Sequence, residues 1–179
     1  AGNLNAEDDG NQVIEIPDTI PPSYFNASLD YGTGRLTVWF TEYMSTLPGN
    51  IDLSKVQLND VADFDDAAGN LGGATLVPAL KAYALEIQAD LTEAQRSHAL
   101  LRSSMPPNAI TDTSINLDIK SGAFRDFGGA IIGDESGNFV WESPDIVPPT
   151  VTSASLDYGT GTLTVQFSET LDITPTVTQ

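Results

Sequence analysis

The chain has 179 residues, no cysteine, and 25 acidic against 7 basic side chains, for a formal net charge of −18 at pH 7. The lack of cysteine excludes disulfides, thiolate metal sites and cysteine nucleophiles. The scarcity of Lys and Arg argues against nucleic acid as a partner, because phosphate binding needs clustered basic side chains. No apolar run approaches the roughly 20 residues of a membrane span.

Two antiparallel strands joined by a glycine-rich turn are the first predicted elements. The first strand is Ser23–Asp30, and the second is Arg35–Glu42. In the second strand Leu36, Val38 and Phe40 alternate with polar or outward-facing residues, the period-two pattern of a strand with one buried face. Glycine in the turn supplies the positive φ values that tight hairpins require.

Five further strands and one helix follow along the chain. The strands are predicted at Lys55–Leu58, Thr75–Leu80, Ala84–Ala89, Ile115–Ile119 and Phe139–Glu142. The segment Leu91–Leu101 favours a short helix over one end of the sheets, because Thr92 can cap its amino end and acids precede bases along it. About seven short strands separated by Gly, Pro, Asn and Asp clusters predict an all-β antiparallel sandwich.

The first and last 52 residues are two copies of one segment. The octapeptide ASLDYGTG at Ala27–Gly34 recurs 127 positions later at Ala154–Gly161, and 23 of the 52 aligned pairs are identical. A repeat of this length is typical of tandem domains rather than of a solenoid. The sequence therefore predicts the end of a preceding repeat at 1–17, a complete repeat at 18–143 and the incomplete beginning of the next at 144–179.

Several motifs in order resemble the immunoglobulin-like repeats of bacterial and archaeal surface proteins, including S-layer proteins of ammonia-oxidising archaea and large cyanobacterial surface proteins. The motifs are PDTIPP at Pro17–Pro22, LTVWFTE at Leu36–Glu42 with its echo LTVQFSE at Leu163–Glu169, IDLSKVQLND at Ile51–Asp60, LTEAQR at Leu91–Arg96 and INLDIKSGAFRD at Ile115–Asp126. Such repeats usually read D-x-x-GN after the sixth strand, where this chain has DFGG. The resemblance implies an immunoglobulin-like fold and a secreted structural module without enzymatic activity.

The acidic surplus suggests a metal site. Opposite strand directions place Asp18 beside Glu42 and, one repeat later, Asp145 beside Glu169, while other acids fall in loops at the two ends of a repeat. Calcium takes six to eight oxygen ligands, so acids from two adjoining repeats could share an ion. The candidate ligands are Asp18, Glu42, Asp63, Asp65, Asp66, Asp126, Asp145 and Glu169. Solvated loop acids without any ion are the open alternative. Asn26 begins an N-glycosylation sequon.

Catalytic patterns are weak. His98 is the single histidine, no GxSxG motif is present, and Gly69–Gly73 lacks the Lys and Ser or Thr of a phosphate-binding loop. A carbohydrate- or host-surface-binding module is an alternative, with Trp39, Tyr43 and Tyr31 as contacts. The second copy has Gln166 and Thr170 at the first two of these positions, so Trp39 is predicted to face outward and a binding role shared by both copies cannot depend on them.

The favoured interpretation is mechanical. We expect an extracellular, cell-surface repeat that assembles end to end with neighbouring copies in an S-layer, adhesin stalk or filament, stiffened by prolines and by calcium at the junctions. Residues 1–18 duplicate residues 128–145, so a fibre built by strand exchange between subunits is a further alternative.

Overall fold

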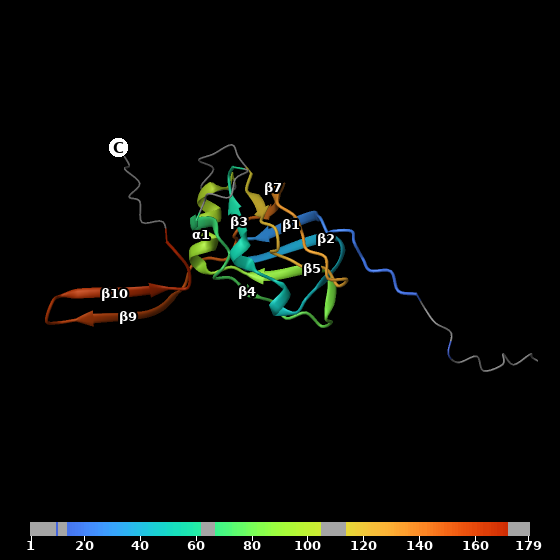
Figure 1. The fold of residues 1–179 in the computed structure, drawn as a ribbon. Coiled ribbons are helices and arrows are strands. Elements are labelled where there is room, and N and C mark those ends of the chain that lie inside the picture. The colour runs from blue at the N-terminus through green and yellow to red at the C-terminus, as the bar shows by residue number, and fades with distance from the viewer. Residues whose placement is uncertain (1–9, 11–13, 62–66, 105–113, 172–179) are drawn as a thin grey trace, which may run out of the picture.

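The computed structural model describes residue 10 and residues 14–61, 67–104 and 114–171. Within these residues the chain forms two β-sheets, a separate β-hairpin and one α-helix (Figure 1). Short 3-10 helices at Pro48–Asn50, Leu53–Lys55 and Ala67–Gly69 lie in the connections. The predominance of strands confirms the predicted all-β class.

The larger sheet has five strands in the order β4-β5-β2-β1-β8. Their bounds are Thr75–Leu76 for β4, Tyr83–Asp90 for β5, Arg35–Ser45 for β2, Tyr24–Asp30 for β1 and Trp141–Ser143 for β8. Neighbouring strands are antiparallel, except that β1 and β8 run parallel. This pairing departs from the predicted purely antiparallel arrangement.

The smaller sheet is antiparallel, in the order β3-β6-β7. Its strands are Val56–Asn59, Asn116–Ile119 and Glu135–Phe139. Buried side chains from both sheets belong to one cluster, which includes Leu36 and Phe40 of β2 and Leu58 of β3. The rings of Phe40 and Phe124 meet edge to face with centroids 5.0 Å apart. The two sheets therefore share one core, as the layers of a sandwich do.

Two predicted strands differ from the structure by more than their end residues. The single strand expected at Phe139–Glu142 is two strands, because the chain leaves the smaller sheet after β7, buries Val140, and continues as β8 of the larger sheet. The strand expected at Thr75–Leu80 keeps ladder pairing only over β4. A register shift between Tyr24 and Asn26 interrupts the pairing of β1 with β2, and the side chain of Phe25 between them is exposed.

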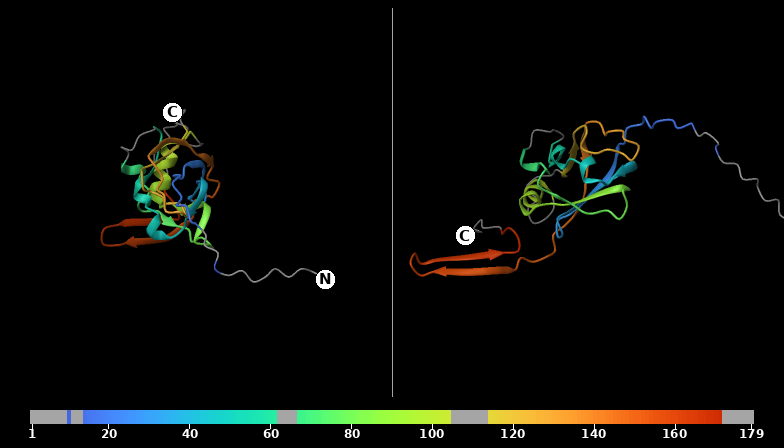
Figure 2. Two further views of the ribbon diagram at one scale, coloured as in Figure 1. Left: turned by 45° about the vertical axis from the view of Figure 1, so that its right-hand side comes forward. Right: turned by 60° about the horizontal axis from the view of Figure 1, so that its bottom comes forward.

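Helix α1 spans Glu93–Arg102, close to the predicted Leu91–Leu101. Thr92 caps it as predicted, and Gln95 completes a reciprocal capping box by accepting a hydrogen bond from the backbone N–H of Thr92. Figures 1 and 2 show α1 at the end of the sandwich from which the last hairpin projects, whereas the N-terminal segment leaves from the opposite end. The molecule therefore has two distinct ends.

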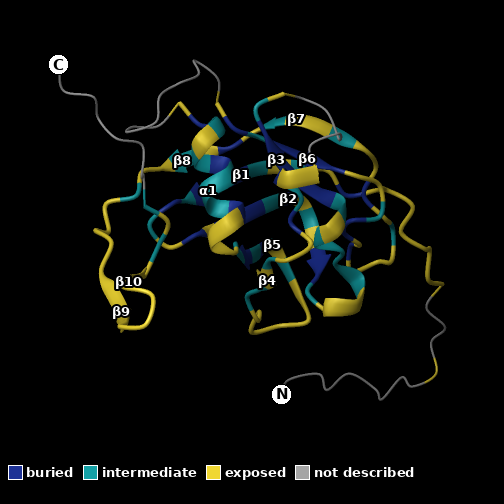
Figure 3. Cartoon of the chain, turned by 90° about the vertical axis from the view of Figure 1, so that its left-hand side faces the viewer, coloured by how far each residue is buried: buried dark blue, intermediate teal, exposed yellow. Residues whose placement is uncertain are grey.

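The projecting hairpin consists of β9 (Val151–Asp157) and β10 (Thr162–Phe167), paired antiparallel with each other. All residues of both strands are exposed, as Figure 3 shows in yellow. Their counterparts in the first copy, β1 and β2, lie within the sandwich. The sequence repeat therefore produces the same local structure in two different environments.

Candidate functional site

Arg96 lies at the α1 end of the sandwich and is the centre of a cluster of charged groups. Its side chain is only 13 % exposed. Nη1 donates to the carbonyl oxygen of Tyr31 at 2.8 Å and to Asp145 Oδ2 at 3.2 Å. Nη2 donates to Glu169 Oε2 at 3.0 Å and pairs with Glu93 Oε2 at 2.8 Å. One guanidinium group thus ties α1 and the β1–β2 turn to the root of the β9–β10 hairpin. We call these contacts the arginine clasp.

Glu93 adds a direct bond between the helix and the hairpin root. Its Oε1 accepts a hydrogen bond from the backbone N–H of Thr170 at 2.8 Å. Burial by itself would raise the pKa of Glu93, but the hydrogen bonds from Arg96 and Thr170 outweigh it and lower the pKa below the usual 4.5. Glu93 is therefore ionised at neutral pH and places a negative charge beside the guanidinium group of Arg96.

The hairpin held by the clasp repeats β1–β2 position by position. Leu29 pairs with Leu36, and 127 residues later Leu156 pairs with Leu163. The register shift near the open end of the ladder recurs as well, and the last turn glycine has φ 69° in both copies. The repeated sequence therefore encodes a repeated backbone, including its irregular part.

Three carboxylates meet at the opposite end of the sandwich. One carboxylate oxygen from each of Asp18, Glu42 and Asp126 lies within 4.8 Å of the others. Asp18 precedes β1, Glu42 is on β2, and Asp126 is held beside β2 by an antiparallel bridge to Met44. A Cβ atom at Gly128 would come 2.8 Å from Asp18 Cβ, so only glycine lets this loop approach the N-terminal segment so closely. We call these three acids the carboxylate cluster.

The carboxylate cluster concentrates negative charge. Burial raises the pKa of Glu42, and the nearby charges of Asp126 and Asp18 raise it further. Asp126 is 2 % exposed, and its Oδ1 accepts hydrogen bonds from the backbone N–H groups of Gly129 and Ala130. Its Oδ2 is buried without a hydrogen-bond partner. Among the described residues no Lys, Arg or His forms an ion pair with any of the three.

The predicted metal ligands fall into three sets. Asp18, Glu42 and Asp126 come together as one candidate cation site. Asp145 and Glu169 also come together, but around the guanidinium group of the clasp. The remaining candidates, Asp63, Asp65 and Asp66, lie outside the described residues.

The aromatic residues proposed as ligand contacts are arranged differently from expectation. Tyr31 is fully buried and donates a hydrogen bond to Glu142 Oε1 at 2.6 Å, so its assignment to a binding surface was wrong. The side chain of Trp39 is half-buried. Tyr43 is exposed, and Tyr83, which had no predicted role, packs edge to face against it at 5.5 Å. The ring centroid of Phe127 also lies 5.0 Å from that of Tyr83.

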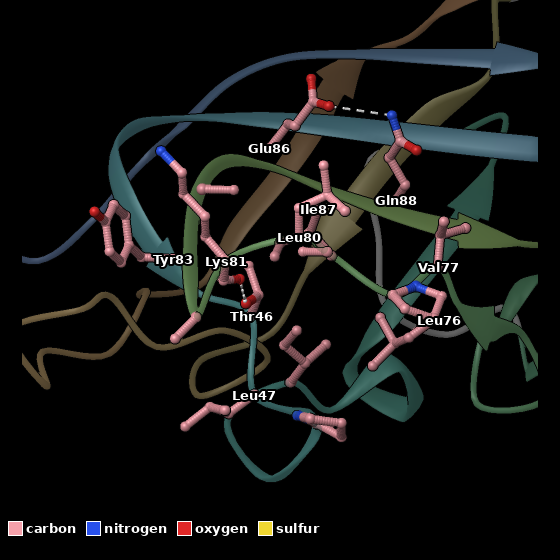
Figure 4. Close-up of a pocket in the computed structure, with 16 residues that line it drawn as sticks. Thr46, Leu47, Leu76, Val77, Leu80, Lys81, Tyr83, Glu86, Ile87 and Gln88 are labelled. Carbon is pink, nitrogen blue, oxygen red and sulfur yellow. Dashed lines mark hydrogen bonds between the residues drawn. The ribbon is translucent and has the colours of Figure 1, made fainter.

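A groove of about 800 Å³ lies beside Tyr83. It is lined by the chain from 76 to 88 and by residues between 46 and 51, mostly with aliphatic side chains (Figure 4). Lys81 places its Nζ 5.8 Å from the centre of the Tyr83 ring at the rim. Polar side chains of the lining include Thr46, Lys81, Glu86 and Gln88, and Glu86 Oε1 accepts a hydrogen bond from Gln88 Nε2 at 3.1 Å.

Two other predicted residues have local partners. Asn26 is half-buried on β1, and its Oδ1 accepts a hydrogen bond from the backbone N–H of Ala27 at 2.9 Å. His98 is half-buried on α1, with Nδ1 3.2 Å from Nη1 of Arg102. These contacts are those of packing residues in a strand and a helix.

Arg96 and Glu93 were missed by sequence reasoning, although a signal was available. Only 7 residues of the chain are Lys or Arg. Few basic side chains are therefore available to pair with the acids that recur in the second copy, and a basic residue on the predicted helix is one of them. What the sequence could not supply was the position of the helix relative to the next copy.

Comparisons with known proteins give no match: no family model, no curated protein and no solved structure is similar to the chain. Within the parts of the chain that the structure describes, no helix is long and apolar enough to cross a membrane. The arginine clasp and the carboxylate cluster, at the two ends of the sandwich, are therefore the features that bear on function.

Proposed function

We propose that this protein is a structural repeat of a large extracellular surface protein, whose immunoglobulin-like units are assembled end to end in an S-layer, an adhesin stalk or a filament. The observation that carries the proposal is the arginine clasp, in which Arg96 of one unit holds Asp145 and Glu169 of the next copy. A charged group buried this far between two copies fixes their relative orientation rather than leaving a loose linker.

The strand order supports the immunoglobulin-like part of the proposal. One sheet has the order β4-β5-β2-β1 and the other β3-β6-β7, which corresponds to the D-E-B-A and C-F-G arrangement of such sandwiches. After β7 the chain crosses to the larger sheet, where β8 pairs in parallel with β1. This crossing leads the chain directly from the end of one unit into Pro144 and the next copy.

The linker adds stiffness to the clasp. Pro148 and Pro149 restrict the backbone before β9, as Pro21 and Pro22 do before β1. Asp145 Oδ1 accepts a hydrogen bond from the backbone N–H of Val147 at 2.9 Å, which preorients this carboxylate for Arg96. Proline restriction and ion pairing act on the same short segment.

Small-angle X-ray scattering of recombinant proteins with two and three consecutive copies of residues 18–144 tests the proposal. We expect rod-like particles whose longest dimension grows by a constant increment per copy. Arg96→Ala in every copy removes the clasp and should give the scattering of flexibly linked beads. Arg35→Ala in every copy is the matched control, because Arg35 pairs with Asp90 in an exposed salt bridge within its own unit. Flexible particles with Arg96 intact would contradict the proposal.

A binding module is the second candidate function, favoured by the exposed rings of Tyr43, Tyr83 and Phe127. Aromatic faces stack on sugars and on apolar surfaces. A glycan array probed with the 179-residue chain and with Tyr83→Ala separates the two functions: reproducible binding lost in the variant supports recognition. Concentration-dependent polymers of the unaltered chain would instead favour strand exchange.

A further inference from the structure

The carboxylate cluster has unused ligand oxygens. Asp18 uses Oδ1 to accept a hydrogen bond from the backbone N–H of Ile20 at 3.0 Å, and Asp126 uses Oδ1 for two backbone amides. These bonds leave one oxygen of Asp18, one oxygen of Asp126 and both oxygens of Glu42 without a hydrogen bond among the described residues. Three carboxylates that approach this closely with free oxygens repel one another unless a cation lies between them.

The free oxygen of Asp126 is independent support for a ligand. A buried carboxylate oxygen without a partner is costly, and native structures rarely retain one. Asp126 is 2 % exposed, and no described side chain or backbone group satisfies its Oδ2. A cation at the cluster would remove that cost and would balance the charges that raise the pKa of Glu42.

In the second copy, two of the three equivalent positions bind a cationic side chain. Asp145 and Glu169 are the repeat counterparts of Asp18 and Glu42, and they bind the guanidinium group of Arg96 at 3.2 and 3.0 Å. Even there Glu169 Oε1 stays buried without a hydrogen bond.

We propose that Asp18, Glu42 and Asp126 bind a divalent cation, specifically calcium. Oxygens within 4.8 Å of one another can share one ion at the Ca–O distance of about 2.3–2.6 Å, with water completing six to eight ligands. Magnesium fits less well, because it retains most of its water and is usually bound through only one or two carboxylates. A role of this ion in holding adjacent units together, in addition to the arginine clasp, rests on the proposed function. The binding of the ion to this chain does not rest on it.

Isothermal titration of the 179-residue chain with calcium chloride in chelator-treated buffer tests the site. We expect one site with a dissociation constant on the order of 10⁻⁴–10⁻³ M, as in extracellular calcium modules, and weaker binding of magnesium. Asp126→Asn and Glu42→Gln should each weaken calcium binding about tenfold or more, because each removes a charged ligand. Glu15→Gln is the control, since it removes an equal charge from an exposed position three residues before Asp18 and should leave the affinity unchanged.

Circular dichroism of each variant shows whether it remains folded. Glu42→Gln tests the site even if Asp126→Asn unfolds the loop, because Glu42 lies on a strand and keeps its size in the substitution. Absence of binding heat together with a melting temperature that a chelator leaves unchanged would overturn the proposal. So would wild-type affinity in both variants, and equal magnesium affinity would overturn the assignment to calcium. None of these outcomes bears on the scattering of the tandem proteins, so the two proposals fail separately.

Discussion

Leu36 and Leu163 occupy the same position in the two copies, with the same cross-strand partner, yet they are 2 % and 64 % exposed. Local sequence determines that both are on the apolar face of a hairpin. Only Leu36 has a second sheet packed over that face. The two copies therefore have the same strand structure at this position but differ in whether the side chain is buried.

The substitution Leu36→Ala should destabilise the protein by about 2–5 kcal/mol, because it removes a buried side chain and leaves a cavity. Leu163→Ala makes the same chemical change on the exposed hairpin and should change the free energy of unfolding by less than about 0.5 kcal/mol. Urea unfolding followed by circular dichroism measures both. Equal costs for the two substitutions would show that the hairpin has a packed partner.

The burial of Tyr31 could not be predicted from its local sequence. Its position in a glycine-rich turn indicates exposure, and its counterpart Tyr158 in the second copy is in fact exposed. In the first copy Glu142 accepts the hydrogen bond of the phenol, and burial together with this carboxylate raises the pKa of Tyr31 well above its usual 10.0. The strand that brings Glu142 there is far away in the sequence.

At the scale of elements, α1 is the part whose sequence signals were most complete. Thr92 Oγ1 accepts a hydrogen bond from the backbone N–H of Gln95, and the backbone N–H of Thr92 donates the reciprocal bond to Gln95 Oε1. The helix is only ten residues long, so its stability depends on this cap and on packing. Its first turn carries Glu93 and Arg96, so the cap also positions the clasp.

Thr92→Ala should lower the free energy of unfolding by about 0.5–2 kcal/mol, because it leaves helix N–H groups without an acceptor. Thr33→Ala, at an exposed position of the β1–β2 turn, makes the same side-chain change without removing a cap. Thermal unfolding of both variants measures the difference. If the two variants were equally stable, the capping box would contribute nothing in solution.

The pairing of β8 with β1 is an element that sequence reasoning did not find. Alternation around Phe139–Glu142 indicated one strand, but the chain changes sheets at the buried Val140. A parallel pair needs no hairpin signal, since its strands are joined by a long connection. The local sequence pattern does not show which of the two sheets a strand in this segment joins.

On the scale of the whole molecule, the two ends are complementary. One end presents the carboxylate cluster around Asp18, and the other presents Arg96 already bound to the repeat counterparts of Asp18 and Glu42. The proposed end-to-end assembly would join such units head to tail rather than through a two-fold interface. In that proposal, a basic side chain of one unit binds acidic side chains of the next.

The attachment of the hairpin should depend on pH through Glu93. Because its folded-state pKa is lowered below 4.5, the bonds of Glu93 contribute stability that is fully present above that value and is lost as the pH falls through the lowered pKa. The amide chemical shift of Thr170 in NMR spectra should report this loss with a midpoint below 4.5. Glu93→Gln should remove that transition, and a midpoint at or above 4.5 would contradict the assignment.

The sequence by itself determined the β1–β2 hairpin and its repeat, the turn glycines and the capped helix, because each depends on residues a few positions apart. It also placed Asp18 beside Glu42, since a hairpin register is a local property. Only the tertiary structure decided that Asp126 joins them in a buried position, that β8 lies beside β1 and that Arg96 reaches the next copy. Those contacts join segments separated by dozens of residues, and their distances depend on how these segments pack in three dimensions.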